Sequence, residues 1–139
     1  MNCGELASKP PVTITIDKTV EEAAEMMANH HVGLLVIVDK ENPKKPLGVI
    51  SERDIIRTIA GKAPLTVTVD KAGTMKNFVY VYADEPITAA ARKMKQFGVR
   101  HVVVLDRNGD LVGVISIRDL IGERNILEIL ARDRAPTQE

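Results

Sequence analysis

The chain has few aromatic residues, one cysteine and no excess of either charge. Only 3% of its 139 residues are aromatic while 45% are hydrophobic, so a core would consist mainly of valine, isoleucine, leucine, alanine and methionine. The single cysteine, Cys3, excludes an internal disulfide bond and fits a reducing compartment. Because 19 basic residues balance 19 acidic ones, net charge gives no argument for nucleic acid or an anionic membrane as a partner.

Long apolar runs are missing as well. No run approaches the roughly 18 residues of a membrane-spanning helix, and the first residues lack the basic-then-apolar pattern of a secretion signal. We therefore expect a cytoplasmic protein. Its length suits one ordinary domain or two small halves with a shared core, because a half of about 60 residues alone would be marginally stable.

An internal repeat is the main positive feature of the chain. Residues 48–56 (GVISERDII) return as 113–121 (GVISIRDLI), and each copy follows an apolar run that ends in an aspartate. The aspartates, Asp39 and Asp106, are 67 residues apart, whereas the corresponding positions of the later motif are 65 residues apart. The two extra residues of the first copy lie in the loop 40–46. Self-similarity at a fixed spacing indicates two copies of one structural unit.

Periodicity predicts the same order of elements in both copies. The first copy has strands at 12–16, 32–38 and 47–50, with helices at 20–29 and 51–60. The second copy has strands at 78–82, 100–105 and 111–115, a helix after Pro86, and a last helix from Ser116 to about Arg132. Each copy is therefore a β-α-β-β-α unit.

These elements predict two repeats joined by a linker. Repeat one with the N-terminal segment takes residues 1–61, the linker takes 62–77, and repeat two takes 78–139. Within the linker, Val67 and Val69 suit one extra short strand.

A Ser-x-x-Asp step stands at the start of a helix in both copies, at Ser51 to Asp54 and at Ser116 to Asp119. One interpretation is helix capping, in which the serine accepts a hydrogen bond from an early helical N–H group. The other is ligand binding, because a helix N-terminus binds phosphate and an aspartate one turn later accepts hydrogen bonds from ribose hydroxyls. Capping alone does not require the whole Gly-Val-Ile-Ser-x-Arg-Asp motif to recur, so the duplication favours a ligand site.

With these motifs the chain resembles a tandem pair of cystathionine-β-synthase-type (CBS) domains, an adenosyl-ligand sensor also called a Bateman module. The resemblance rests on the order of elements, the buried strands 32–39 and 99–106, and both Gly-x-x-Ser-x-x-Asp steps, and it covers roughly residues 8–125. It implies an α/β fold in which two β-α-β-β-α repeats pack with pseudo-two-fold symmetry into one module, leaving two clefts.

The resemblance also implies which residues line the clefts, since each takes the serine and aspartate of one repeat and the start of the middle strand of the other. One cleft would contain Ser51, Arg53, Asp54, Phe78, Val79, Arg100 and His101. The other would contain Pro11, Val12, Val32, Gly33, Leu34, Ser116, Arg118 and Asp119. The aspartates would hold ribose hydroxyls, the serines and cations the phosphate, and the apolar backbone the adenine.

The two clefts differ at the start of the middle strand. Arg100 and His101 in repeat two correspond to Gly33 and Leu34 in repeat one. Two cationic or polar donors favour a phosphate-bearing ligand in the Asp54 cleft. The second cleft is then weaker, empty or suited to a less charged adenosyl ligand.

The expected function is regulatory and not enzymatic. The module would bind AMP, or ADP or ATP, and act in trans on an unknown partner protein. It would do so as a homodimer in which the apolar last helix, with the early helix of each repeat, packs against a second copy. A sensor of S-adenosylmethionine and a ligand-free structural subunit are the alternatives. We expect no catalytic residue and no metal site, because a Gly-rich phosphate loop and a metal-binding carboxylate pair are missing. We expect no nucleic-acid partner, because the net charge is neutral and aromatic residues are few, and no membrane partner, because long apolar runs are missing.

Overall fold

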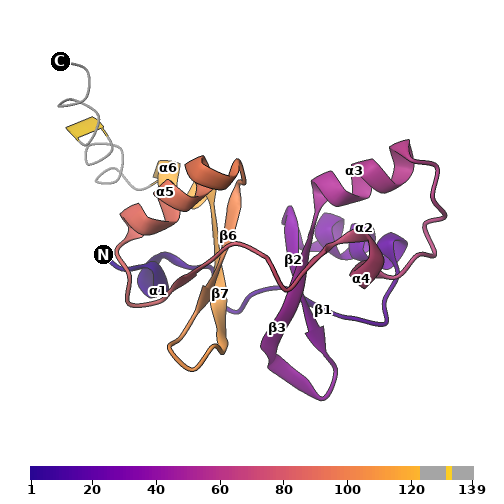
Figure 1. The fold of residues 1–139 in the computed structure, drawn as a ribbon, viewed down its shortest axis with the longest axis horizontal. Coiled ribbons are helices and arrows are strands. Elements are labelled where there is room, and N and C mark those ends of the chain that lie inside the picture. Colours follow the sequence, from indigo (N-terminus) through magenta and orange to yellow (C-terminus); the bar gives the residue numbers. More distant parts are fainter. Residues whose placement is uncertain (123–130, 133–139) are drawn as a thin grey trace. The chain divides into compact units, whose positions relative to one another are not determined.

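The computed structural model describes residues 1–122 and 131–132. Its helices and strands form two compact units, each with its own sheet (Figure 1). The repeat-one unit is Pro11–Phe78, and the repeat-two unit combines Met1–Pro10 with Val79–Glu139. This mixed α/β architecture confirms the predicted fold class.

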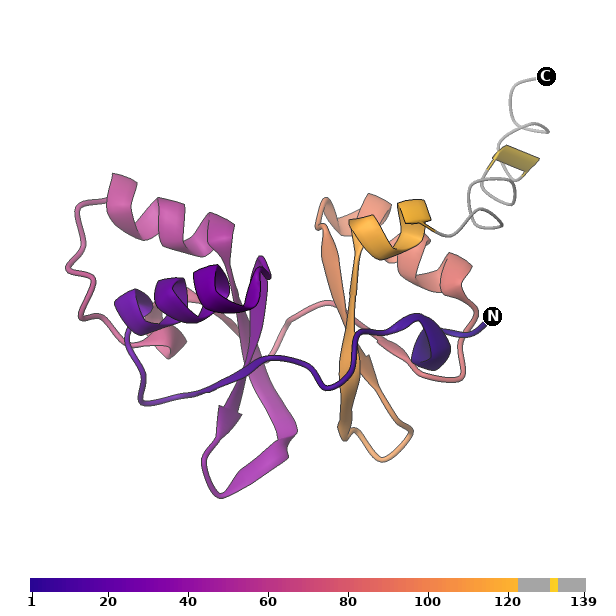
Figure 2. The same ribbon diagram turned by 180° about the vertical axis from the view of Figure 1, so that it is seen from behind.

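The repeat-one unit is a four-stranded sheet with its two longer helices on one face (Figures 1 and 2). Its elements are β1 (Thr13–Thr15), α2 (Val20–His30), β2 (Leu34–Asp39), β3 (Asn42–Ser51), α3 (Glu52–Ala60), α4 (Val69–Ala72) and β4 (Thr74–Met75). The strand order is β1-β2-β3-β4. The β1–β2 pair is parallel, whereas β3 is antiparallel to both of its neighbours.

The repeat-two unit repeats this plan with three strands. Its elements are α1 (Cys3–Leu6), β5 (Tyr80–Tyr82), α5 (Ile87–Phe97), β6 (His101–Leu105), β7 (Leu111–Ser116) and α6 (Ile117–Gly122). The order is β5-β6-β7, with β5 parallel and β7 antiparallel to β6. The predicted β-α-β-β-α order is therefore confirmed in both units.

The helices form where capping and an apolar face coincide. Thr19 caps α2, because its hydroxyl accepts from the Glu22 N–H while the Glu22 carboxylate accepts from the Thr19 N–H. The buried residues of α2 are spaced by three and four, so one side of the helix faces the sheet. They join the strand residues in the core of the repeat-one unit: Ile14, Val20, Ala23, Met27, Leu35, Ile37, Ile50 and Val69.

The predicted loop 40–46 is mostly strand in the structure. The β2–β3 hairpin extends to Asn42, which pairs with Asp39, and its register shifts on both sides of Val38. Residues 42–45 are exposed, so the lysines and prolines of this segment can lie in a ribbon that projects past the core. The sequence predicted a loop here because lysine and proline are depleted from buried strands.

The N-terminal segment packs within the repeat-two unit, although the sequence pattern predicted that it belongs with repeat one. The N–H groups of Cys3, Gly4 and Ser8 donate to the carbonyls of Glu85, Ala83 and Val114, at 2.8, 2.9 and 3.0 Å. Cys3 and Ala7 are buried in that unit's core. These backbone hydrogen bonds leave little trace in side-chain periodicity, which explains the different assignment.

Part of the predicted linker 62–77 packs within the repeat-one unit, as the N-terminal segment does within the repeat-two unit. Val69 begins the short helix α4 and is fully buried, and its N–H donates to the carbonyl of Lys18 at 2.9 Å. Thr74 in β4 then pairs with Val49. The extra strand is therefore β4, and the prediction of a strand at Val67 and Val69 is wrong.

We call residues 2–8 and 68–75 the lead-in segments. Cys3 and Val69, which begin α1 and α4, are 66 residues apart, close to the repeat spacing. A Cβ atom added to Gly48 would lie 2.5 Å from the Thr74 carbonyl oxygen, and one added to Gly113 would lie 2.5 Å from that of Ser8. The glycine of each Gly-Val-Ile-Ser motif therefore allows a lead-in segment to cross the strand.

The last helix is described only in part. Ser116 precedes α6 as predicted, and α6 is described to Gly122. The prediction that this helix continues to about Arg132 falls largely on residues 123–130, outside the described residues. Among the residues with described positions, no helix has the length and apolar character needed to span a bilayer.

Candidate functional site

The Ser51 step forms a closed capping box at the start of α3. The Asp54 N–H donates to the Ser51 hydroxyl at 3.3 Å, and the Asp54 Oδ2 atom accepts from the Ser51 N–H at 2.9 Å and from its hydroxyl at 3.1 Å. Asp54 is only 8% exposed. The carboxylate is therefore held against the helix N-terminus, where the macrodipole favours a negative charge.

The second carboxylate oxygen of Asp54 has a different neighbour. Oδ1 lies 3.7 Å from Nη1 of Arg57, one turn further along α3. Arg57 is not among the site residues predicted from the sequence. Its spacing of three residues from Asp54 was the signal that could have identified it, since side chains three apart are neighbours on a helix.

The Ser116 step repeats the box in the repeat-two unit. The Ser116 N–H donates to Asp119 Oδ2 at 2.8 Å, and the Asp119 N–H donates to the Ser116 hydroxyl at 3.3 Å. Asp119 is half-buried. The capping interpretation is thus correct at both steps, and both carboxylates are fixed and shielded from full solvent exposure.

Each step lies beside the start of the middle strand of its own sheet. Ser51 pairs with Leu34, and Ser116 pairs with His101. The first N–H of each helix donates to the same strand start, from Glu52 to the Gly33 carbonyl at 3.0 Å and from Ile117 to that of Arg100 at 2.8 Å. The predicted grouping of each step with the strand start of the other repeat stays a prediction.

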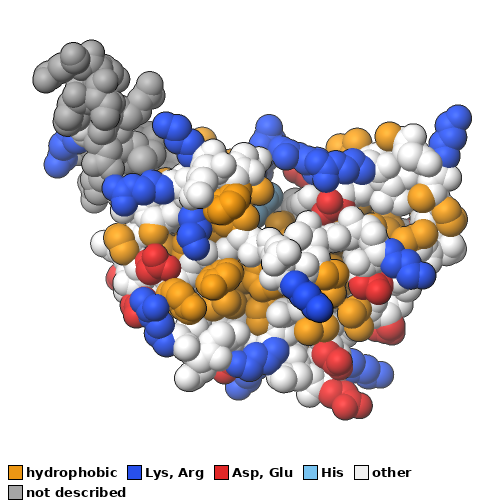
Figure 3. Space-filling view, in the orientation of Figure 1, with side chains coloured by type: hydrophobic (Ala, Val, Ile, Leu, Met, Phe, Trp, Pro, Cys, Tyr) orange, Lys and Arg blue, Asp and Glu red, His pale blue; other side chains and the backbone are white. Residues whose placement is uncertain are grey.

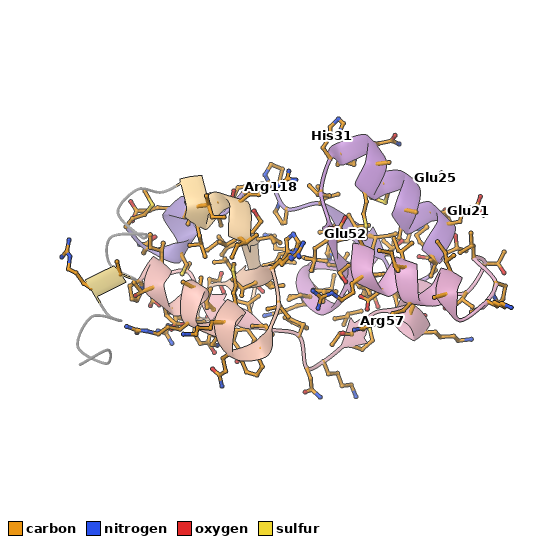
Figure 4. All side chains as sticks on the ribbon, turned by 90° about the horizontal axis from the view of Figure 1, so that it is seen from above. Glu21, Glu25, His31, Glu52, Arg57 and Arg118 are labelled. Carbon is orange, nitrogen blue, oxygen red and sulfur yellow. The ribbon has the colours of Figure 1, made fainter. Side chains whose placement is uncertain are left out.

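The remaining predicted site residues occupy equivalent places in the two units. The carbonyl of Val12 accepts from Val36 and that of Val79 accepts from Val103, both at 3.1 Å, so each lies beside a middle strand. These flanking residues are half-buried: Pro11, Val12, Val32, Gly33, Phe78 and Val79. Arg53 and Arg118 are exposed in the first turns of α3 and α6, and Figure 4 labels Arg118.

The arrangement offers hydrogen-bond acceptors and cations. Each box presents a fixed carboxylate with a basic residue one position before it. Within residues 1–122 and 131–132, no group of three or more histidine, cysteine, aspartate or glutamate side chains could hold a metal ion. The local chemistry therefore suits a ligand that carries both hydroxyl groups and negative charge.

Comparison with known proteins identifies the repeat. Residues 3–61 and 69–125 match the family model of the CBS domain. The chain belongs to the CBS domain family. The two matches begin at the helices α1 and α4, so the family repeat includes the lead-in segments.

Relatives match this chain over differing shares of their own length. The chain is 34% identical to an uncharacterised 17.7 kDa protein of Acidianus ambivalens, over 84% of this chain and 68% of the relative. It is 29% identical to the L-aspartate semialdehyde sulfurtransferase of Methanocaldococcus jannaschii, again over 84% of this chain but only 22% of the enzyme. The match therefore covers a small part of that enzyme.

Two solved structures of CBS pairs contain adenosyl ligands. A CBS domain protein of Pyrobaculum aerophilum, solved in complex with AMP, has a TM-score of 0.89 and 41% identity, over 95% of this chain and 99% of that one. The CBS pair of protein MJ0100, in complex with 5′-methylthioadenosine and S-adenosyl-L-methionine, has a TM-score of 0.78 and 28% identity. That match covers 87% of this chain and 93% of the other.

Proposed function

We propose that this CBS pair is a non-catalytic regulatory module that binds an adenine nucleotide, with AMP as the preferred ligand over ADP and ATP. The carboxylates of Asp54 and Asp119 accept hydrogen bonds from the ribose hydroxyls. The serines and neighbouring basic residues hold the phosphate. The module acts in the cytoplasm and in trans on a partner protein.

The duplicated, shielded carboxylate is the observation that carries this proposal. Asp54 and Asp119 are held in the same geometry by Ser51 and Ser116, and a carboxylate fixed in advance loses little freedom when it binds a sugar. The 41% identity to a CBS protein solved with AMP supports the choice of nucleotide. The participation of Arg100 and His101 rests on the family resemblance.

A ligand panel tests the proposal. AMP, ADP, ATP and S-adenosylmethionine are added separately to the whole chain, and the melting temperature is measured. A ligand that binds only the folded state raises the melting temperature with concentration. We expect AMP to give the largest rise and the double variant Asp54→Ala, Asp119→Ala to abolish it. No shift with any ligand at millimolar concentration would overturn the proposal.

A ligand-free structural subunit is the second candidate. It is favoured by the closure of both boxes within their own helices, because capping alone accounts for those hydrogen bonds. On this hypothesis Asp54→Ala changes only stability. The ligand panel separates the two candidates, since a structural subunit shows no nucleotide-dependent stabilisation.

Exposed isoleucines support the proposed homodimer. Ile56 and Ile59 on α3 are 63% and 58% exposed, and Ile121 on α6 is 60% exposed. Basic and apolar side chains both lie over α3 in the space-filling view (Figure 3). Neighbouring isoleucines on a helix surface lose contact with water when a second copy covers them.

Light scattering of the wild type and of Ile56→Asp, Ile59→Asp tests the dimer. We expect a dimeric mass for the wild type at micromolar concentration and a monomeric mass for the variant. A monomeric wild type would contradict the dimer and leave nucleotide binding untouched.

A further inference from the structure

The two carboxylate oxygens of Asp54 face different partners. Oδ2 is occupied by the N–H and hydroxyl groups of Ser51. Oδ1 lies 3.7 Å from the Arg57 guanidinium. The Asp54 side chain is 11% exposed and the Arg57 side chain is 72% exposed. The oxygen that takes no part in the cap is therefore the one beside a cation.

The contact between Arg57 and Asp54 is one that a ligand can replace. An ion pair with a largely exposed arginine contributes little to stability, because water solvates the guanidinium almost as well. Arg57 lies on α3, where Figure 4 labels it. A ribose hydroxyl can therefore take Oδ1 while the guanidinium moves aside and keeps its charge nearby.

Repeat two has no cation at the corresponding position. Gly122 lies three residues after Asp119, as Arg57 lies three residues after Asp54. The two carboxylates thus share the two backbone capping hydrogen bonds and differ in the charge three residues further along the helix. A carboxylate repels an anionic ligand, and a guanidinium beside it offsets much of that repulsion at a distance of several ångströms.

We infer that Arg57 determines charge specificity at the repeat-one site: beside the ribose-binding carboxylate of Asp54, it favours adenosyl ligands that carry phosphate over uncharged or cationic ones. The inference rests on the proposed adenosyl-ligand function and deepens it. AMP, methylthioadenosine and S-adenosylmethionine share the adenosine moiety and differ in charge. Arg57 therefore sets which of them the site prefers.

Calorimetric titration of the whole chain with AMP and with methylthioadenosine tests the inference. An Asp119→Ala background confines the measurement to the repeat-one site. In Arg57→Gln the ratio of AMP affinity to methylthioadenosine affinity falls about three- to tenfold, the effect of one charge at a distance of several ångströms. Arg57→Lys, which keeps the charge, restores most of the ratio.

A matched control removes a positive charge elsewhere in the same unit. Lys44 is exposed near the far end of β3 from Ser51, and the seven residue steps from one to the other span about 23 Å of strand. This exceeds the Debye length of about 8 Å at physiological ionic strength. Lys44→Gln therefore leaves the ratio unchanged.

The outcomes separate the inference from the proposed function. If the parent chain binds both ligands and Arg57→Gln leaves their ratio unchanged, the inference is overturned and the proposed function stands. An equal fall in Lys44→Gln also overturns it, because the effect is then one of net charge. If the wild-type chain binds neither ligand, the proposed function fails and the inference fails with it.

Discussion

The helix that follows Ser51 and the helix that follows Ser116 begin with the same two backbone capping hydrogen bonds in different electrostatic surroundings. In the repeat-one unit, a cation lies on the helix itself at Arg57, and the strand residue beside the serine is Leu34. In the repeat-two unit, Gly122 takes the helix position, and the strand residue beside the serine is His101. The repeats thus keep the cap and differ in the placement of charge.

The caps are shared and the charges differ because it is mainly the caps that stabilise the fold. The serine and aspartate satisfy N–H groups at a helix start, so their loss costs stability wherever the repeat occurs. Arg57 is largely exposed and contributes little to the fold. Positions of that kind can change between repeats without harm to the fold, and they are where ligand preference can diverge.

Among the changes that distinguish the two units, loss of a lead-in segment should have the largest effect on stability. Deletion of residues 1–8 removes the buried Cys3 and Ala7 and three backbone hydrogen bonds from the repeat-two unit. We expect a loss of about 3–5 kcal/mol in the free energy of unfolding. In hydrogen exchange, the amides of β6 and β7 should lose protection more than those of β2 and β3.

Equal loss of protection in both sheets would show that the segment does not belong to one unit. Glu5→Ala is the control for this experiment. It disrupts only the exposed capping box with Asn2 and should leave the protection of β6 and β7 intact.

A second test compares Cys3 with its counterpart Val69. Burial, with a smaller contribution from the carboxylate of Glu85, raises the pKa of the Cys3 thiol from 9.0 to about 11. A raised pKa means that the folded state holds the proton more tightly, so stability is intact below pH 9 and falls as the pH rises through 11. We expect about 2 kcal/mol to be lost across this range.

Urea unfolding at pH 8 and at about pH 11 measures this loss. Cys3→Val, which copies the residue of the other lead-in segment, should show a smaller decrease. If wild type and variant decline equally, the thiol is not the responsible group.

The third test compares the two boxes. Asp54 accepts hydrogen bonds from the N–H and the hydroxyl of Ser51 and is more deeply buried than Asp119. We expect Asp54→Ala to cost about 1.5 kcal/mol and Asp119→Ala about 1 kcal/mol in the free energy of unfolding. Denaturant titration of the single variants measures both values, and a larger cost at Asp119 would reverse the ranking.

The smallest test concerns the ends of α2 and α5. Both helices end in a left-handed residue, His31 with φ 56° and Gly98 with φ 64°. Because glycine adopts this conformation without strain, His31→Gly should stabilise the chain, and Gly98→Ala should destabilise it, each by about 0.5–1 kcal/mol. A change of the same sign in both variants, measured by thermal melting, would contradict this explanation.

Much of this architecture could be predicted from the sequence, because its signals are local. Alternating and helical periodicity predicted the strands and helices of both repeats, and the capping interpretation of the two Ser-x-x-Asp steps was correct. The lead-in segments were missed since their contacts are backbone hydrogen bonds between distant residues, such as Ser8 to Val114. The residue pattern of a single sequence does not indicate which distant backbone groups form hydrogen bonds with each other.

The candidate site was predicted unevenly for a similar reason. Ser51, Asp54, Ser116 and Asp119 were found because the motif recurs whole. Arg57 was missed because it has no counterpart in repeat two, where the residue is Gly122. A search for repeated motifs finds what two copies share, and the difference between the copies has to come from the geometry around each one.

Calorimetric titration with AMP and with 2′,3′-dideoxy-AMP tests most directly whether Asp54 and Asp119 hold ribose hydroxyls. The two nucleotides share adenine and phosphate and differ only in the groups that the carboxylates would bind. We expect AMP to bind at least about tenfold more tightly, with this advantage lost in Asp54→Ala, Asp119→Ala. Equal affinity of the wild-type chain for both nucleotides would contradict the account.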